Sequence, residues 1–337
     1  MAEIYRENSD ILFIYDAKMC NPNGDPDDEN KPRMDYATKT NLVSDVRLKR
    51  YIRDYLRKLE DSHGSPLYEI FVSKVEDQTV DATKRLQALF ENYEENGKKT
   101  KIDINKLEDK HIDWLLNSLI DVRFFGATMP IKPAEGKLKG TPLNFTGPIQ
   151  FNWGYSLNKV EIMESSTITS HFAGRGEEGK GEYGTFGKDW RVYYSLIAFH
   201  GIISGKRAIK TKLNEKDIIV FDNAMIHAIP LEATTRSKIG QTPRLYIRIE
   251  YADDTFFLGD LRRYLKLRKD DGKIRDISEV DIDMTKLANL LDSASNKIEK
   301  IYLWEHVDFT FLSQNLPNNL KNKIQNLPHQ IETEEKK

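Results

Sequence analysis

The sequence has a single cysteine, Cys20, and no apolar run near the roughly 20 residues needed to span a bilayer. One cysteine excludes an internal disulfide and any zinc site that uses several cysteine ligands. The first residues, Met1 to Glu7, carry charges of both signs and lack the apolar core of a signal peptide. We therefore expect a cytoplasmic protein that makes no contact with a membrane.

Recognisable enzyme motifs are also scarce. The seven histidines show no zinc-binding spacing, and there is no Gly-x-Ser-x-Gly motif. Gly174–Gly179 matches GxGxxG, but the glycine-rich Gly181–Gly187 that follows is a poor start for the helix that a phosphate loop needs. The acidic run Asp25–Glu29 departs from a calcium loop at Asn30 and Tyr36, and a solvated turn is the favoured interpretation. We predict no catalytic residue, no metal site and no cofactor.

Net charge is close to zero, with 51 Lys+Arg against 53 Asp+Glu, which by itself argues against nucleic-acid binding. The charges are unevenly spread, however. Residues 1–36 hold nine acidic and four basic side chains, and residues 76–121 hold 11 acidic and seven basic. Residues 122–160 hold five basic and one acidic, and residues 171–248 hold 13 basic and eight acidic. The average therefore conceals basic segments.

The apolar pattern predicts an α+β fold. Residues 10–17 are apolar over most of their length, which is typical of a strand covered on both faces. A turn-rich segment follows at 21–26, and then a helix over 44–60 that is capped by Ser44. Apolar side chains share one face of this helix, while basic side chains gather on another: Arg47, Arg50, Arg53 and Arg57.

The rest of the chain adds an insertion and a hairpin to this pattern. Residues 61–120 are rich in helix formers, with helices expected at 80–93 and 106–120. Six of the 14 positions in 174–187 are glycine, between strand patterns at 166–172 and 191–199, which predicts a flexible hairpin. We further expect strands at 121–125, 147–156 and 244–251, and helices at 215–228, 259–269 and 285–295. Without the additions the order is β-α-β-β-α-β, the ferredoxin-like unit.

Basic and aromatic side chains alternate around the hairpin. The cations are Arg175, Lys180, Lys188 and Arg191, and the aromatic residues include Phe172, Tyr183, Phe186 and Trp190. Aromatic rings can stack on bases while cations hold phosphates. The basic helix alone is more typical of a solvated face, but helix and hairpin together favour nucleic-acid binding.

Five strings carry a specific resemblance: 21–27 (NPNGDPD), 30–35 (NKPRMD), 43–56 (VSDVRLKRYIRDYL), 121–127 (DVRFFGA) and 146–151 (TGPIQF). They resemble, in the same order, blocks of a CRISPR-associated family, the RAMP-type backbone subunit of Cascade, the type I surveillance complex. The match extends over about residues 8–252 and is most similar to subtype I-B, then I-C.

The resemblance implies a hand-shaped α+β protein. An RRM-like, ferredoxin-like palm would comprise 1–60 and 121–252, with a β-hairpin thumb at about 160–190. Residues 61–120 would be a helical finger insertion and 253–337 a C-terminal extension. Further copies would polymerise along CRISPR RNA and present it for pairing with target DNA, alongside other Cascade subunits. A recruited nuclease-helicase would cut the target, so the resemblance implies that this chain is not an enzyme.

The resemblance also implies RNA contacts. Guide phosphates would meet Asn21 and Asn23 in the loop and Arg47, Lys49, Arg50 and Arg53 on the helix, with Lys49 and Arg50 as the principal pair. Alternatively, Lys49 lies against the palm and leaves Arg50 and Arg53 outside. The implied thumb contacts are Phe172, Arg175, Lys180 and Phe186. Met129 would either wedge beside a displaced base or belong to the core.

Two alternatives differ in function. Related type III backbone subunits cut target RNA with an Asp in a loop near this position, which would be Asp25 or Asp27 here, using a divalent metal. A free-standing RNA-binding module outside any complex is the second alternative.

Overall fold

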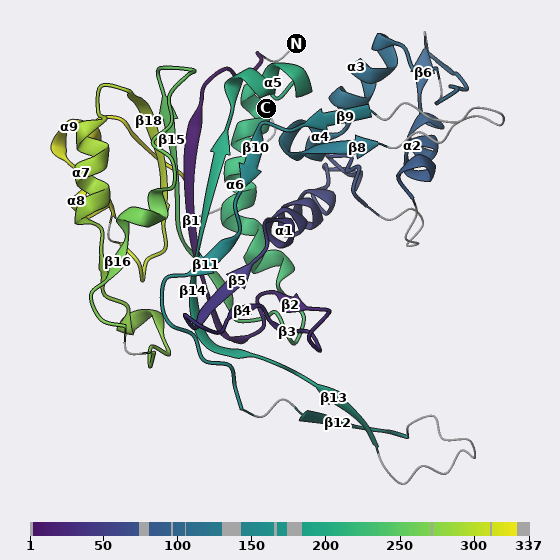
Figure 1. Cartoon of the computed structure of the whole chain (residues 1–337). Helices are drawn as coiled ribbons and strands as arrows, with labels where there is room; N and C mark the ends of the chain where they lie inside the picture. Colours follow the sequence, from purple (N-terminus) through teal and green to yellow (C-terminus); the bar gives the residue numbers. More distant parts are fainter. Residues whose placement is uncertain are drawn as a thin grey trace.

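The computed structural model describes residues 3–73, 81–95, 97–104, 106–129, 143–164, 167–173, 184–270, 272–310 and 312–328. Over these ranges the chain has the expected α+β fold, built on one large sheet (Figure 1). None of the helices in these ranges is long and apolar enough to cross a membrane. The order of strands across the sheet is β19 (Ile324–Asn326), β18 (Ile298–Glu305), β15 (Gln241–Tyr251), β1 (Ser9–Cys20), β14 (Val192–Ile203), β11 (Gly154–Ser156), β5 (Thr40–Val43) and β4 (Met34–Asp35), and β10 (Ile149–Phe151) also pairs with β14.

Strand β1 lies at the centre of the sheet. It is antiparallel to both neighbours, so that Phe13 is opposite Phe199 on β14 and Tyr246 on β15. Every residue from Ser9 to Ala17 is buried. The sheet centre is therefore dry on both faces, which confirms the predicted buried strand.

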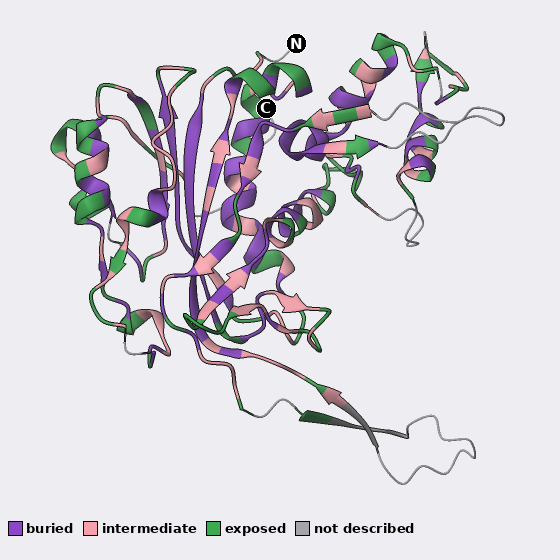
Figure 2. Cartoon of the chain, in the orientation of Figure 1, coloured by how far each residue is buried: buried purple, intermediate pink, exposed green. Residues whose placement is uncertain are grey.

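One face of the sheet packs on two helices, α1 (Asp45–Arg57) and α6 (Glu215–Glu232). Alternate β1 residues such as Phe13 meet Ile52 of α1 and Phe221 of α6 in a single apolar cluster. Figure 2 shows the buried residues concentrated in the sheet and in the helix faces turned toward it. Burial of each such side chain stabilises the fold by about 1.5–3 kcal/mol, so this layer fixes where α1 sits.

The opposite face is covered by the C-terminal residues, the predicted extension, in which the helix predicted over 285–295 forms as α7 (Thr285–Ser293). Leu12 and Ile14 of β1 cluster there with Leu287 of α7. The same region adds β18 to the edge of β15, with β19 parallel to β18. Its remaining elements are η1 (Leu261–Tyr264), β16 (Lys266–Leu267), η2 (Ile277–Glu279), β17 (Ile282–Asp283), α8 (Leu312–Asn315) and α9 (Asn318–Lys321).

The helix predicted over 259–269 is wrong. Only the single turn η1 forms, because the chain is held on both sides of it. The backbone N–H groups of Leu258 and Gly259 donate to the Asp10 carboxylate, and Lys266–Leu267 pairs with β17.

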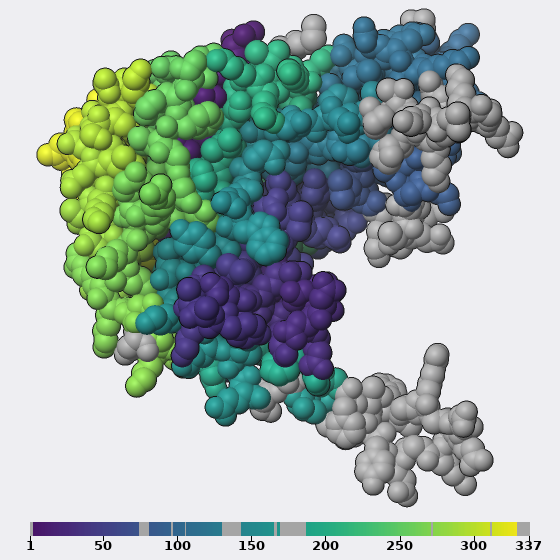
Figure 3. Space-filling model, viewed as in Figure 1, coloured from purple at the N-terminus to yellow at the C-terminus, as the bar shows by residue number. Residues whose placement is uncertain are grey.

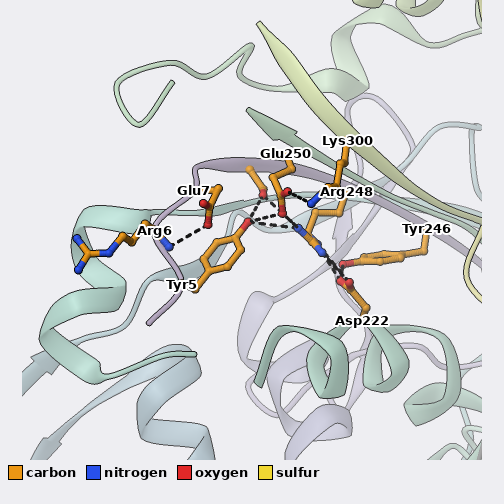
Figure 4. Close-up of polar contacts among 9 residues, drawn as sticks. Tyr5, Arg6, Glu7, Asp222, Tyr246, Arg248, Glu250 and Lys300 are labelled. Atoms are coloured by element: carbon orange, nitrogen blue, oxygen red, sulfur yellow. Dashed lines mark hydrogen bonds and ion pairs between the residues drawn. The ribbon is translucent and has the colours of Figure 1, made fainter. Parts of the chain in front are cut away.

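A buried polar network fastens β15 to α6 (Figure 4). Arg248 is enclosed completely, and its guanidinium donates to Asp222 of α6 and to Glu250. The ring of Tyr302 on β18 stacks on the same guanidinium at 3.9 Å. Tyr246 also donates its hydroxyl proton to Asp222, and the pKa of Tyr246 is raised, chiefly by burial. Each charge in this network thus has a partner, as buried charges require.

The insertion contains the two predicted helices as α2 (Ala82–Phe90) and α3 (Asp109–Ser118), with a small hairpin of β6 (Glu94–Glu95) and β7 (Lys98–Lys99) between them. The strand predicted at 121–125 is wrong, because this segment is helix α4 (Ile120–Phe125). Ile120 and Phe124 pack on the main core while Val122 packs on the insertion, so both sides are apolar. A short apolar run of this kind does not distinguish helix from strand. Helix α4 ends at Gly126, where β8 (Gly126–Met129) begins and pairs with β9 (Leu143–Thr146).

The predicted hairpin is present as β12 (Thr167–Ala173) and β13 (Gly184–Lys188). It projects from the lower end of the sheet in Figure 1 and runs directly into β14. Near its base, Thr167 is opposite Lys188. The remaining described elements are β2 (Gly24–Asp25), β3 (Lys31–Pro32) and α5 (Gly205–Thr211).

Candidate nucleic-acid interface

The loop before α1 is held by its two asparagines. The Asn23 amide oxygen accepts from the Ser44 backbone N–H (2.8 Å) and hydroxyl (2.9 Å), so Ser44 stands at the cap position without capping the helix through its own side chain. Asn21 is 2% exposed, and its side-chain N–H donates to the Asn30 carbonyl (2.7 Å). Both predicted RNA contacts therefore shape the loop that positions the start of α1.

The basic residues of α1 divide into two groups. Lys49 is 8% exposed and donates to Asp45 and to Gln150, each at 3.0 Å. Lys49 therefore lies against the sheet side, as in the second of our two expectations, but Arg53 is not left outside as that expectation has it. The Arg50 side chain is 56% exposed and donates through Nε to Asp54 (2.6 Å), so it presents its charge to solvent.

Arg53 and Arg47 are partly covered. Arg53 donates through Nε to Asp121 (2.9 Å), and its side chain is 12% exposed. The Arg47 guanidinium lies over the Tyr51 ring at 4.1 Å, while its buried Nε has no hydrogen-bond partner among the described residues. Both guanidinium groups are thus held in place by neighbouring side chains.

A residue that sequence reasoning missed, Lys238, lies beside this loop. It follows α6, and its ammonium group donates to the Asn21 carbonyl (2.6 Å). Burial and, next, the nearby Arg47 charge lower the pKa of Lys238 to about 8. The only signal in the sequence was the basic character of residues 171–248, which does not single out one lysine.

The base of the hairpin contacts the acidic loop. Lys188 donates to Glu29 (2.6 Å), and the Lys31 ammonium lies 5.0 Å from the Trp190 ring centre. Arg191 pairs with Asp189 at 2.8 Å. The first two contacts place the base of the hairpin against the loop 21–33.

The remaining predicted RNA contacts lie in three different parts of the chain. Phe172 and Phe186 lie on β12 and β13, and Arg175 and Lys180 fall outside the described residues. Met129 is fully buried in the cluster that holds Leu115 and Leu119. This placement is the core alternative for Met129 and corrects the wedge interpretation.

The surface is hollowed beside α1. In Figure 3 a concave face opens between the N-terminal segment, drawn in purple, and the insertion, drawn in blue. Helix α1 spans the same interval in Figure 1. A basic helix at the floor of a hollow is an arrangement suited to the backbone of a polyanion.

Comparison with known proteins identifies the family. A family model described as "CRISPR-associated protein Cas7" matches residues 7–285. The chain belongs to the Cas7 family. A curated CRISPR-associated protein Cas7 from Haloferax volcanii is 32% identical over 305 residues, which is 88% of this chain and 86% of that protein.

One solved structure shares the fold. A chain from a structure described as "CRISPR RNA-guided surveillance complex, pre-nicking" is 14% identical, with a TM-score of 0.55, and the match covers 96% of each chain. A second, described as "CRISPR RNA-guided surveillance complex", is also 14% identical, with a TM-score of 0.48, and the match covers 91% of this chain and 92% of that one. The Cas7 family assignment thus rests on sequence, and the TM-score of 0.55 shows a shared fold.

The two acidic candidates of this Cas7 family member lie in the loop 24–33. Asp25 pairs with Arg33 (2.9 Å), and its other oxygen accepts from the Asp27 backbone N–H (3.2 Å). Within the described ranges, no three His, Cys, Asp or Glu side chains converge as metal ligands would. The Asp25 carboxylate therefore has a structural role in this loop.

Proposed function

We propose that this protein is a CRISPR RNA-binding backbone subunit of a type I Cascade complex, most similar to subtype I-B, in the cytoplasm. Copies polymerise along the guide and present its bases to target DNA. Other Cascade subunits complete the complex, and a recruited nuclease-helicase cuts the target. The observation that carries the proposal is the basic helix α1, at the floor of a hollow between the N-terminal segment and the insertion, in a member of the Cas7 family.

The proposal divides the molecule into palm, fingers and thumb. The neighbour order β15-β1-β14-β11, with α1 and α6 on one face, supports an RRM-like palm from residues 1–60 and 121–252, because a β-α-β-β-α-β chain produces this order. Residues 61–120 are the fingers and about 160–190 the thumb. Residues 253–337 are an extension of the palm.

The guide is held on the side of the palm that carries α1, and not on the opposite face of the sheet. Many RRM domains stack bases on that face, but here the C-terminal residues cover it. Arg50 meets the guide phosphates directly, and Lys49 orients Gln150 and Asp45 behind it. Because such contacts grip the backbone, base pairing supplies the sequence specificity.

The chain itself cuts no RNA or DNA under this proposal. The pairing of Asp25 with Arg33 supports this part, because a metal-binding carboxylate must be free to meet its ion. The function therefore rests on binding and assembly alone.

Assembly on guides of different length tests the proposal. Purified protein is mixed with two CRISPR RNAs that differ only in spacer length, and the mass of each complex is measured by size-exclusion chromatography with light scattering. We expect more copies on the longer guide. A 1:1 complex on both RNAs indicates a free-standing module, and the absence of any complex overturns the proposal.

A further inference from the structure

A pocket with a volume of about 380 Å³ lies where α1 meets the insertion. Three arginines and Asp54 of α1 and one arginine of α2 line it, and its other walls come from Ile70–Ser73, Ala82 and Thr128. The volume falls at the lower end of the range for small-molecule sites. The four arginines are Arg50, Arg53, Arg57 and Arg85.

The sequence places the arginines of α1 on one side of that helix. Arg50, Arg53 and Arg57 are spaced three and four residues apart, so their side chains are neighbours. Arg85 faces them from the second helix. The pocket is thus bounded by cations from two segments that are far apart in the chain.

Two of the four guanidinium groups are fixed by the protein. The fully buried Asp121 accepts from Arg53 Nε (2.9 Å) and from the Phe71 backbone N–H (2.8 Å). Arg85 donates to the carbonyl oxygens of Ile70 (2.6 Å) and Phe71 (3.3 Å) and pairs with Glu69. These cations are therefore ordered before any ligand arrives, which lowers the entropy lost on binding.

The arginines also keep unused donors. Arg50 and Arg53 engage their carboxylates only through Nε, and their terminal nitrogens have no partner in the part of the chain that the structure describes. The nearest carboxylate to Arg57 is that of Asp54, at 3.7 Å. A guanidinium has five N–H donors in a planar fork that matches the oxygens of a phosphate.

The charge of the site favours an anion. Four arginines face three nearby carboxylates, those of Asp54, Glu69 and Asp121, which leaves one positive charge. Glu69 and Asp121 bind their arginines from behind the wall and are absent from the lining. The surface of the pocket therefore carries more positive charge than the four arginines and three carboxylates do together.

We propose that this pocket holds a phosphate of a bound single-stranded RNA, so that Arg57 and Arg85 grip the strand together with Arg50 and Arg53. The proposal rests on the proposed function for the source of the strand. RNA is favoured over an acidic side chain of another protein because the basic stripe of α1 continues from the pocket to Arg47. The half-exposed Val72 also gives an apolar wall on which a sugar or base can lie.

Salt-dependent RNA binding tests this proposal. A labelled, unstructured single-stranded RNA is titrated with the full-length protein by fluorescence anisotropy at several salt concentrations. Arg57→Ala removes an exposed cation and is expected to lower the slope of log affinity against log salt by about 0.7, the value for one phosphate contact on a single strand. Arg57→Lys keeps the charge and is expected to keep most of the slope.

Two further variants control for folding and for bulk charge. Arg263→Ala removes an exposed arginine of the C-terminal region, and its slope is expected to equal that of the wild type. Arg85→Ala is expected to lower the slope as Arg57→Ala does. Because Arg85 also holds Ile70 and Phe71, the RNA titration of Arg85→Ala is interpreted only together with a thermal melt. If Arg85→Ala fails to fold, the result for Arg57→Ala alone tests the proposal.

The outcomes separate this proposal from the proposed function. If the wild type binds RNA and Arg57→Ala has an unchanged slope, the pocket is not a phosphate site, and the proposed function stands. If Arg57→Ala alters self-association of the RNA-free protein and leaves the slope unchanged, the pocket receives a second copy, and the proposal is overturned. If the wild type binds no RNA, the proposed function fails and the pocket proposal fails with it.

Discussion

Arg248 and Asp222 form an ion pair that is almost completely shielded from solvent, with 2.8 Å between Nη2 and Oδ2. The pair joins β15 at the centre of the sheet to α6, the helix that packs beside α1. It therefore links the layer beneath the candidate interface to the sheet on which that layer rests.

Removal of one partner of this pair is expected to destabilise the protein strongly. Asp222→Ala leaves the Arg248 charge buried with only Glu250 to balance it, which should lower the free energy of unfolding by about 3–5 kcal/mol. Urea denaturation followed by circular dichroism measures the loss. The control is Asp254→Ala, which breaks an exposed contact with Lys206 at 3.7 Å and should change stability by no more than about 1 kcal/mol. Equal effects of the two variants would show that the buried pair contributes no more to the free energy of unfolding than the exposed pair does.

Two adjacent residues of α1 should behave differently in RNA binding. Arg50→Ala removes an exposed charge and is expected to lower the salt slope by about 0.7 while the protein remains as stable as the wild type. Lys49→Ala leaves Asp45 and Gln150 without a partner and should mainly lower stability, by about 1–3 kcal/mol. RNA titration and denaturation of both variants check the contrast. The opposite result, with Lys49→Ala changing only the slope, contradicts the placement of Lys49 against the sheet.

The stability of the protein should depend on Lys238 at alkaline pH. Burial lowers the pKa of Lys238 from 10.5 to about 8 in the folded protein, which corresponds to roughly 3 kcal/mol. Between these two values the unfolded chain binds more protons than the folded one, so this residue makes stability rise as pH increases from about 8 to about 10.5. Below about pH 8 both states are protonated and the penalty is fully present.

Lys238→Met removes this contribution. Compared with the wild type, the variant should be more stable near pH 7, and the difference should shrink as pH rises toward 10.5. Denaturation curves at a series of pH values measure the difference, and groups that do not interact with Lys238 cancel in it. A difference that does not change with pH would contradict the shifted pKa.

Shortening the hairpin should separate folding from assembly. A short turn in place of residues 174–183 leaves the main sheet and its two covering layers intact, so the midpoint of thermal unfolding should stay close to that of the wild type. Assembly on a long CRISPR RNA should weaken, because the proposed thumb can no longer close over the guide. Light scattering of the complexes measures this, and normal assembly by the shortened protein rejects the thumb assignment.

The absence of intrinsic cleavage can be checked directly. Assembled complex is incubated with a complementary RNA and magnesium, and the RNA is examined on a denaturing gel. We expect intact RNA from the wild type and from Asp25→Ala and Asp27→Ala alike. Regularly spaced cuts that either substitution abolishes would establish the metal-dependent alternative.

Patterns that depend on one element alone were readable in the sequence. The apolar run of β1 and the two-faced pattern of α1 each contain enough residues to define strand or helix, and both form as expected. The glycine-rich stretch likewise predicts a hairpin, but its second strand, β13, lies inside that stretch, and the strand predicted at 191–199 is β14 of the main sheet. These features follow from local periodicity and turn chemistry.

What the sequence could not settle depends on distant partners. Lys49 and Arg50 are neighbours on α1, and distant partners such as Gln150 and the Phe125 ring decide that Lys49 is the covered one. The sequence predicts a strand where helix α4 forms, because a short apolar run suits both. Lys238 joins the interface through a contact with Asn21, which is 217 residues away in the sequence.

The pairing of β1 has a consequence for synthesis of the chain. Phe13 and its neighbours are among the first residues to be made, yet their partners Phe199 and Tyr246 are made last among the central strands. At about 5–20 residues per second, the apolar strand waits on the order of 10–50 seconds for both sides to be filled. During that interval an uncovered strand is prone to aggregate. The nascent chain should therefore depend on chaperones until β15 has been made.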